Sequence, residues 1–202
     1  MSSLTTGHIA AAVGDAKAAM VHLEQILNEA DSKLGDGDTG SMLARLIDRL
    51  AEVDLEAATS ISDAFGKLAR AAMGATGSSL GTLLATGLMT ASKMTKDRDS
   101  IEWPELAPIL SASRDAMMVR GGAKLGDKTV LDAIHEVAVA IEGLSDRSSV
   151  AREATQAGHR VLERFFDESC KVGRARMFAD RSIGSHDPGM LAFVRLVDAV
   201  AG

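Results

Sequence analysis

Three carboxylates lie close together in the sequence near the N-terminus: Asp31, Asp36 and Asp38, with Gly35 before Asp36 and Gly37 between the last two. Asp36 and Asp38 are two residues apart in an expected extended turn, so their side chains can point to the same side. Asp31 falls at the expected end of a helix, where its charge opposes the helix dipole. Converging carboxylates repel each other unless a cation lies between them, and an all-oxygen set suits Mg²⁺ or Ca²⁺, with Mg²⁺ favoured beside phosphate oxygens. The alternative is that these residues cap turns and helices.

An EF-hand does not account for this cluster. A loop that began at Asp36 would need a bidentate glutamate at its twelfth position, and Ile47 stands there.

Four glycine-rich segments, each followed by the start of an expected helix, divide the chain. They cover residues 34–41, 74–81, 121–129 and 173–189. A helix N-terminus offers free N–H groups and a partial positive charge, and glycine lets a phosphate approach the backbone closely. Any one of these segments could be a simple turn between helices. Four of them in one chain favour a site for an anionic ligand.

The third segment resembles a phosphate-binding P-loop but departs from it in two ways. Asp127 is inserted between Gly126 and Lys128, and no hydrophobic strand precedes the loop. Lys128 and Thr129 open a helix and could still contact a nucleotide. The alternative is that Asp127 caps this helix and Lys128 is solvated.

The fourth segment contains Ser185-His186-Asp187, which cannot be a nucleophilic triad because adjacent residues do not aim their side chains at one another. The sequence Asp187-Pro188-Gly189 is instead typical of a turn and a helix start. Three arginines in this segment are candidates for phosphate contacts: Arg174, Arg176 and Arg181.

The elements that must position these residues are helices, because apolar residues recur at helical spacing and no sustained alternation of period two occurs. We expect an all-α protein of about eight helices in a single domain, residues 1–202. The expected helices cover 8–30, 41–53, 57–73, 80–93, a segment that starts at Trp103-Pro104, 129–142, 147–169 and 188–200.

Composition excludes several classes of partner. The 202 residues carry a net charge of −6, which disfavours nucleic acid and anionic membrane surfaces as partners. The single Cys170 excludes an intramolecular disulfide and fits a reducing compartment. No signal peptide and no apolar run of membrane-spanning length is visible, so we expect a cytoplasmic protein.

The four segments together identify a family. The chain resembles the nucleotide-binding subunit of dihydroxyacetone kinases (the DhaL type), which is related to the C-terminal domain of the single-chain ATP-dependent enzymes. The resemblance covers essentially the whole chain. It rests on Asp31 with Gly35-Asp36-Gly37-Asp38-Thr39-Gly40, on Gly74-Ala75-Thr76-Gly77, on Gly126-Asp127-Lys128-Thr129, and on Gly173-Arg174-Ala175 with Arg181-Ser182-Ile183-Gly184 and His186-Asp187-Pro188-Gly189.

The resemblance implies a barrel of eight antiparallel helices with ADP or ATP and two Mg²⁺ ions at one end. It implies that Asp31, Asp36 and Asp38 are the metal ligands. The residues it places against the nucleotide are Thr39, Gly40, Ser41, Met42, Ala75, Thr76, Gly121, Thr129, Arg174, His186, Asp187 and Pro188. Two departures from the family pattern stand out. Thr39 replaces a histidine that many of the kinase subunits have, which leaves the acceptor sugar open, and Gly121-Gly122-Ala123-Lys124 replaces the more usual R-G-K-A.

The implied activity is phosphoryl transfer to dihydroxyacetone or a similar short ketose that is held on a separate substrate-binding subunit. This chain would supply only the phosphoryl donor, either as exchanging ATP or as a bound ADP that a phosphohistidine carrier of the phosphotransferase system rephosphorylates. A homodimer is left open. The main alternative is a noncatalytic regulatory subunit that binds Mg-nucleotide, and a purely structural helical bundle would leave the three aspartates unexplained.

Overall fold

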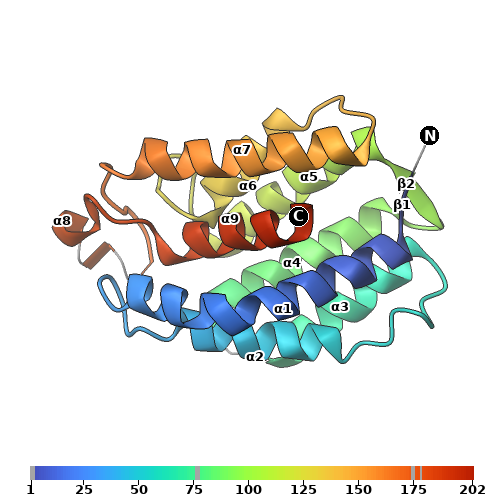
Figure 1. Ribbon diagram of the computed structural model, residues 1–202, viewed down its shortest axis with the longest axis horizontal. Coiled ribbons are helices and arrows are strands. Elements are labelled where there is room, and N and C mark those ends of the chain that lie inside the picture. The colour runs from blue at the N-terminus through green and yellow to red at the C-terminus, as the bar shows by residue number, and fades with distance from the viewer. Residues whose placement is uncertain (1–2, 76–77, 174–175, 178) are drawn as a thin grey trace.

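Helices make up most of this protein (Figure 1). Its structure is a computed structural model that describes residues 3–75, 78–173, 176–177 and 179–202. The helices are α1 (Thr6–Asp31), α2 (Thr39–Ala51), α3 (Ile61–Ala75), α4 (Ser79–Met94), α5 (Leu106–Gly121), α6 (Val130–Ala140), α7 (Arg147–Phe165), α8 (Ala179–Ser182) and α9 (Pro188–Ala201). All except the four-residue α8 correspond to helices expected from the sequence. The all-α prediction is therefore confirmed.

The long helices form a closed ring. Each packs against the next along the chain, and α9 packs against α1, α6 and α7, which closes the ring (Figure 1). The loop between α1 and α2 lies at one end of the bundle with α8, on the left of Figure 1. The N-terminus lies at the other end. The glycine-rich loops are thereby gathered at the left-hand end.

A small sheet was not predicted. β1 (Ser3–Thr5) pairs antiparallel with β2 (Ser100–Glu102), and Leu4 stands opposite Ile101. A 3₁₀ helix (Trp103–Glu105) follows β2 and leads into α5. Strands of three residues are too short for a readable alternation, which is why the sequence pattern missed them.

Apolar stripes on the helices fill the interior of the ring. Leu27, Leu46, Ile61 and Val194 come from four different helices and are fully buried. Each such side chain contributes about 1.5–3 kcal/mol by leaving water. Within the described residues, none of the helices combines the length and the apolar composition needed to cross a bilayer.

Polar N-caps fix where three helices begin at the left-hand end. Ser78 accepts a hydrogen bond from the Gly81 N–H at the start of α4, Thr129 caps α6, and Asp187 caps α9. Such a cap contributes about 1 kcal/mol. These helices therefore direct their N-termini toward the glycine-rich loops.

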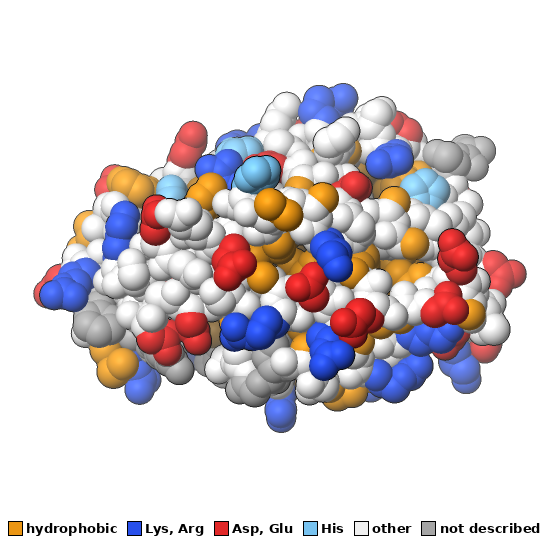
Figure 2. All heavy atoms as spheres, turned by 60° about the horizontal axis from the view of Figure 1, so that its bottom comes forward, with side chains coloured by type: hydrophobic (Ala, Val, Ile, Leu, Met, Phe, Trp, Pro, Cys, Tyr) orange, Lys and Arg blue, Asp and Glu red, His pale blue; other side chains and the backbone are white. Residues whose placement is uncertain are grey.

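The surface carries both signs of charge. On the face shown in Figure 2, Lys and Arg side chains are interspersed with Asp and Glu. Basic side chains do not gather into one patch on that face.

Candidate nucleotide and metal site

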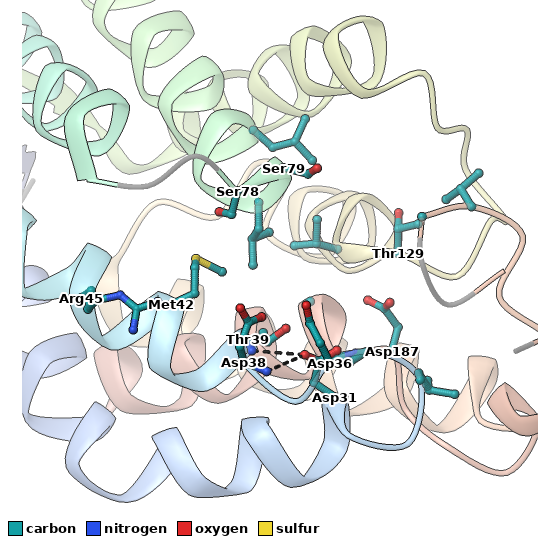
Figure 3. Close-up of a pocket in the computed structure, with 18 of the residues that line it drawn as sticks. Asp31, Asp36, Asp38, Thr39, Met42, Arg45, Ser78, Ser79, Thr129 and Asp187 are labelled. Atoms are coloured by element: carbon teal, nitrogen blue, oxygen red, sulfur yellow. Dashed lines mark hydrogen bonds between the residues drawn. The ribbon is translucent and has the colours of Figure 1, made fainter. Parts of the chain in front are cut away.

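A cavity of about 680 Å³ opens where the glycine-rich loops meet. Its volume is within the range of small-molecule and cofactor sites. The lining comes from the α1–α2 loop and the first turns of α2, from the α3–α4 junction, from the start of α6, and from both ends of the connection between α7 and α9 (Figure 3). All four segments singled out in the sequence thus contribute to one site.

The three aspartates converge on one wall of this cavity. Asp31, Asp36 and Asp38 each offer a carboxylate oxygen, and these oxygens lie within 4.8 Å of one another. Asp31 ends α1 and is buried, whereas Asp36 and Asp38 are exposed to the cavity. Carboxylate oxygens this close are an appropriate donor set for a hard divalent cation such as Mg²⁺. The residues present therefore fit the metal that the sequence predicted.

Backbone contacts hold this loop in shape. The Asp31 Oδ2 accepts hydrogen bonds from the N–H groups of Asp38 (3.0 Å) and Thr39 (3.2 Å), as drawn in Figure 3. A Cβ at Gly35 would lie 2.5 Å from Asp31 Oδ1, so a larger residue there would displace the Asp31 carboxylate. The prediction that these three aspartates lie together is confirmed.

The N-terminus of α2 lies beside the carboxylates. Thr39 and Met42 line the cavity, and so does Arg45 one turn further along the same face. Arg45 is the one Lys or Arg among the described residues of the lining. A helix N-terminus and a guanidinium both favour an anion. The cavity therefore combines acidic groups for a cation with groups that attract phosphate.

The other wall is more apolar. Leu80 and Leu83 of α4 line it together with Val130, Val172 and Pro188. Ser78, Ser79 and Thr129 add hydroxyl groups around them (Figure 3). A planar, mostly apolar group such as a nucleobase can pack on this surface while the hydroxyls make polar contacts.

Asp187 stands between the two walls. Its Oδ1 accepts a hydrogen bond from the Met190 N–H at 2.8 Å, which confirms the expected turn and helix start. Burial raises the pKa of Asp187 to about 6, against the opposing effect of the Met190 bond and of Lys128. This carboxyl group is therefore more easily protonated than the usual aspartate.

Most of the residues named from the sequence line the cavity: Asp31, Asp36, Asp38, Thr39, Met42, Ala75, Thr129, Asp187 and Pro188. Thr76 and Arg174 lie outside the described residues. Gly40 and Ser41 face α1, and Gly121 at the end of α5 lies against the cavity residue Leu83. The His186 ring packs on Phe166 with the centroids 5.0 Å apart, and burial lowers its pKa. Arg176 and Arg181 are exposed and are not part of the described lining.

Both alternatives for Lys128 are wrong. Its side chain is neither solvated nor in the cavity, because it is 1% exposed and its ammonium group is bound to backbone carbonyls. Asp127 does not cap α6 either, since Thr129 does so with Asp132 as its capping-box partner. The Asp127 Oδ2 accepts a hydrogen bond from the Lys124 N–H instead.

Several lining residues were not predicted, Arg45, Ser78 and Ser79 among them. Arg45 stands three residues after Met42 and six after Thr39, so helical spacing places all three on one face. That spacing is the signal that could have found it.

Comparison with known proteins agrees with this geometry. Residues 33–202 match the family model of the DAK2 domain, so the chain belongs to the DAK2 domain family. It is 28% identical over 180 residues to the ADP-binding subunit DhaL of PEP-dependent dihydroxyacetone kinase 1 from Listeria innocua, covering 88% of this chain and 86% of that one.

Two further relatives are longer than this chain. It is 28% identical over 182 residues to L-erythrulose 1-kinase from Mycolicibacterium smegmatis, covering 88% of this chain but 32% of that protein. The crystal structure of the dihydroxyacetone kinase of C. freundii superposes with a TM-score of 0.74 at 25% identity, covering 96% of this chain and 34% of that one. The chain thus spans about a third of the length of these two proteins.

Proposed function

We propose that this chain is the phosphoryl-donor subunit of a kinase that acts on dihydroxyacetone or a similar short ketose held on a separate substrate-binding subunit. The observation that carries the proposal is the convergence of three carboxylates to within 4.8 Å beside the α2 N-terminus, in a cavity of about 680 Å³. The name of the Listeria innocua relative, an ADP-binding subunit of a dihydroxyacetone kinase, supports it. The acceptor includes erythrulose as a candidate, because a second relative is named for that sugar.

Different residues would bind the metal ions, the phosphates and the base of the donor. Asp31, Asp36 and Asp38 would hold a pair of Mg²⁺ ions, which when bound neutralise charge on phosphate oxygens. The α2 N–H groups and Arg45, which line the cavity, would bind the phosphates, and Leu80 and the neighbouring apolar residues would pack on the base. Phosphoryl transfer needs positioning and charge neutralisation rather than a protein nucleophile, and this lining supplies both.

Reconstitution tests the proposal. The chain is mixed with a dihydroxyacetone-binding subunit and dihydroxyacetone, and the phosphoryl donor is either ATP or a phosphohistidine carrier of the phosphotransferase system. Dihydroxyacetone phosphate is the expected product, and the donor that yields it shows whether the nucleotide exchanges or stays bound as ADP. Binding of Mg-ADP without product from either donor or from erythrulose would favour the noncatalytic regulatory alternative.

Two native measurements complete this test. Native mass spectrometry of the purified chain shows whether ADP copurifies, as a bound cofactor should. The same spectrum distinguishes a monomer from a homodimer, and it counts the Mg²⁺ ions retained with the nucleotide.

Arg45 provides a sharper prediction about phosphate binding. We expect Arg45→Met to weaken the affinity for Mg-AMP-PNP about tenfold, since a charge-assisted hydrogen bond to phosphate contributes roughly 1.5 kcal/mol. Isothermal titration calorimetry measures the change. Arg49→Met is the matched control, because Arg49 lies one turn away on α2 and pairs with Glu52 at 2.9 Å. Equal affinities in the two variants would remove Arg45 from the phosphate site.

A further inference from the structure

Lys128 is a buried cation that the proposed chemistry does not use. It precedes the cavity residue Thr129, its side chain is 1% exposed, and its backbone has a φ of 61°. A non-glycine residue rarely adopts this left-handed conformation, which costs on the order of 1 kcal/mol. Burial of an ammonium group is costlier still unless its donors are satisfied. Contacts of the ammonium group must therefore offset the cost of its burial and of the left-handed backbone.

Three backbone carbonyls satisfy the ammonium group. The Nζ donates to the oxygens of Phe166 (3.3 Å), Glu168 (2.7 Å) and Ser182 (2.7 Å). Phe166 and Glu168 follow the end of α7, and Ser182 ends α8. The C-terminal end of α7 carries partial negative charge, which adds to the stabilisation of the cation. An ammonium group has three N–H donors, and each has an acceptor here.

These three carbonyls all belong to the connection between α7 and α9. Other contacts hold the same connection: the Cys170 N–H donates to Ser182 Oγ at 2.8 Å, and the Gly184 N–H donates to the Phe166 oxygen at 2.9 Å. Val172 and Gly173 of this connection line the cavity, and so does Asp187 at its end. Lys128 therefore joins the start of α6 to one wall of the site.

We propose that Lys128 is a positioning residue: its ammonium group holds the carbonyls of Phe166, Glu168 and Ser182 against the α6 N-terminus, and this positions the wall of the cavity to which Val172, Gly173 and Asp187 belong. The inference rests on the proposed function, because it assigns Lys128 a part in nucleotide binding. The carboxylate wall comes from the α1–α2 loop, whereas the hydrogen bonds of the Lys128 ammonium group go to the α7–α9 connection, which touches that loop through Leu34 and Cys170. Loss of the ammonium group should therefore weaken nucleotide binding more than metal binding.

The direction of the pKa shift agrees with this environment. Burial lowers the pKa of Lys128, while the nearby Cys170, Asp187, Glu168 and Asp167 oppose that shift. The carbonyl oxygens supply the direct contacts that keep the charged form in place.

The test compares Lys128→Met with Lys171→Met. Lys171 is the matched control, because it lies in the same connection but is exposed and its Nζ donates to one carbonyl, that of Gly126, at 2.7 Å. In Lys128→Met we expect Mg-ADP affinity to fall about tenfold, comparable with the loss of a supporting contact at other sites. Affinity for Mn²⁺ alone, followed by electron paramagnetic resonance, should fall less than the affinity for Mg-ADP.

Hydrogen exchange supplies a readout that separates positioning from general destabilisation. Peptides that contain the Cys170 and Gly184 amides should exchange faster in Lys128→Met, whereas α1 peptides around Asn28 should not change. Wild-type exchange rates together with wild-type Mg-ADP affinity in Lys128→Met would overturn the positioning role. Faster exchange in all peptides, with equal losses of Mn²⁺ and Mg-ADP affinity, would indicate general destabilisation and would overturn it too.

A second variant covers the case in which Lys128→Met does not fold. Ser182→Ala removes the hydroxyl that accepts from the Cys170 N–H and donates to the Ala179 oxygen, and it should give the same pattern at smaller size. A Ser182→Ala protein in which the Cys170 amide exchanges faster while the Mg-ADP affinity stays at the wild-type value would overturn the inference. Failure of the proposed function gives a different result, since the wild-type chain would then form no sugar phosphate in the reconstitution, whatever the Lys128 and Ser182 variants do.

Discussion

Asp36→Asn is expected to abolish Mg²⁺-dependent nucleotide binding. Asparagine keeps the shape of the side chain but removes one negative charge from a cluster whose oxygens lie within 4.8 Å of one another. Loss of residues that only support metal ligands costs about 10–100-fold in metal affinity, so loss of a ligand should cost about 100-fold or more. Calorimetric titration of Mg-ADP measures this effect, and titration of Mn²⁺ without nucleotide should show the same loss.

In the metal-free protein, Asp36→Asn should not lower the stability and can raise it. Two like charges about 4 Å apart repel by about 1 kcal/mol in water, so removal of one charge relieves repulsion. The melting temperature of metal-free Asp36→Asn should therefore equal or exceed that of the wild type. A ligand at about 100 times its Kd stabilises a protein by about 2.7 kcal/mol, and Mg-ADP should raise the melting temperature of the wild type but not of the variant.

This pair of opposite effects distinguishes a lost ligand from a misfolded loop. Asp15→Asn provides the control, because it makes the same charge change on an exposed part of α1 away from the cavity. It should retain the full response to Mg-ADP. Undiminished Mg-ADP binding by Asp36→Asn would show that the cluster is not the metal site.

The helices were predictable because their signals are local. In α2, Leu43, Leu46 and Leu50 repeat at helical spacing and are buried as the repeat requires. The aspartate cluster was predictable for the same reason, since its members lie within eight residues of one another. Local spacing decides both the element and the grouping of side chains in these cases.

The environment of Lys128 could not be predicted in this way. Its three acceptors lie 38, 40 and 54 residues further along the chain, and they meet the ammonium group only when α7, α8 and α6 have packed together. The sheet has a similar origin, because β1 and β2 are far apart in sequence and each is only three residues long. Contacts of this kind depend on the tertiary fold and leave no periodic pattern.

Gly40→Ala is expected to be the most damaging single change to the stability of the site. A Cβ at Gly40 would lie 2.0 Å from the Glu24 carbonyl oxygen and 2.8 Å from Asn28 Oδ1. The first of these is a backbone atom of α1, so relief requires the two helices to separate. The contacts that would be strained are the Ser41 N–H to Asn28 Oδ1 (3.1 Å) and Ser41 Oγ to Glu24 Oε1 (2.7 Å).

Overpacking of this kind costs about 3 kcal/mol, which for a domain of this size lowers the melting temperature by roughly 6–12 °C. Thermal unfolding of the metal-free protein measures the loss. Gly14→Ala is the control, because Gly14 is exposed in α1 and an added methyl group would have nothing within 4 Å of it. That variant should gain about 1 kcal/mol from helix propensity.

Unfolding of the metal-free protein distinguishes between two roles for Gly40. If glycine is required only so that a phosphate can approach the backbone, Gly40→Ala should unfold like the wild type without ligand and lose affinity only for Mg-ADP. If glycine is required for the close approach of α2 to α1, the stability of Gly40→Ala should fall before any ligand is added. Mn²⁺ affinity should fall as well, because the hydrogen bond from the Asp38 N–H to Asp31 Oδ2 joins the start of α2 to the end of α1. The 2.0 Å approach to Glu24 predicts the second result.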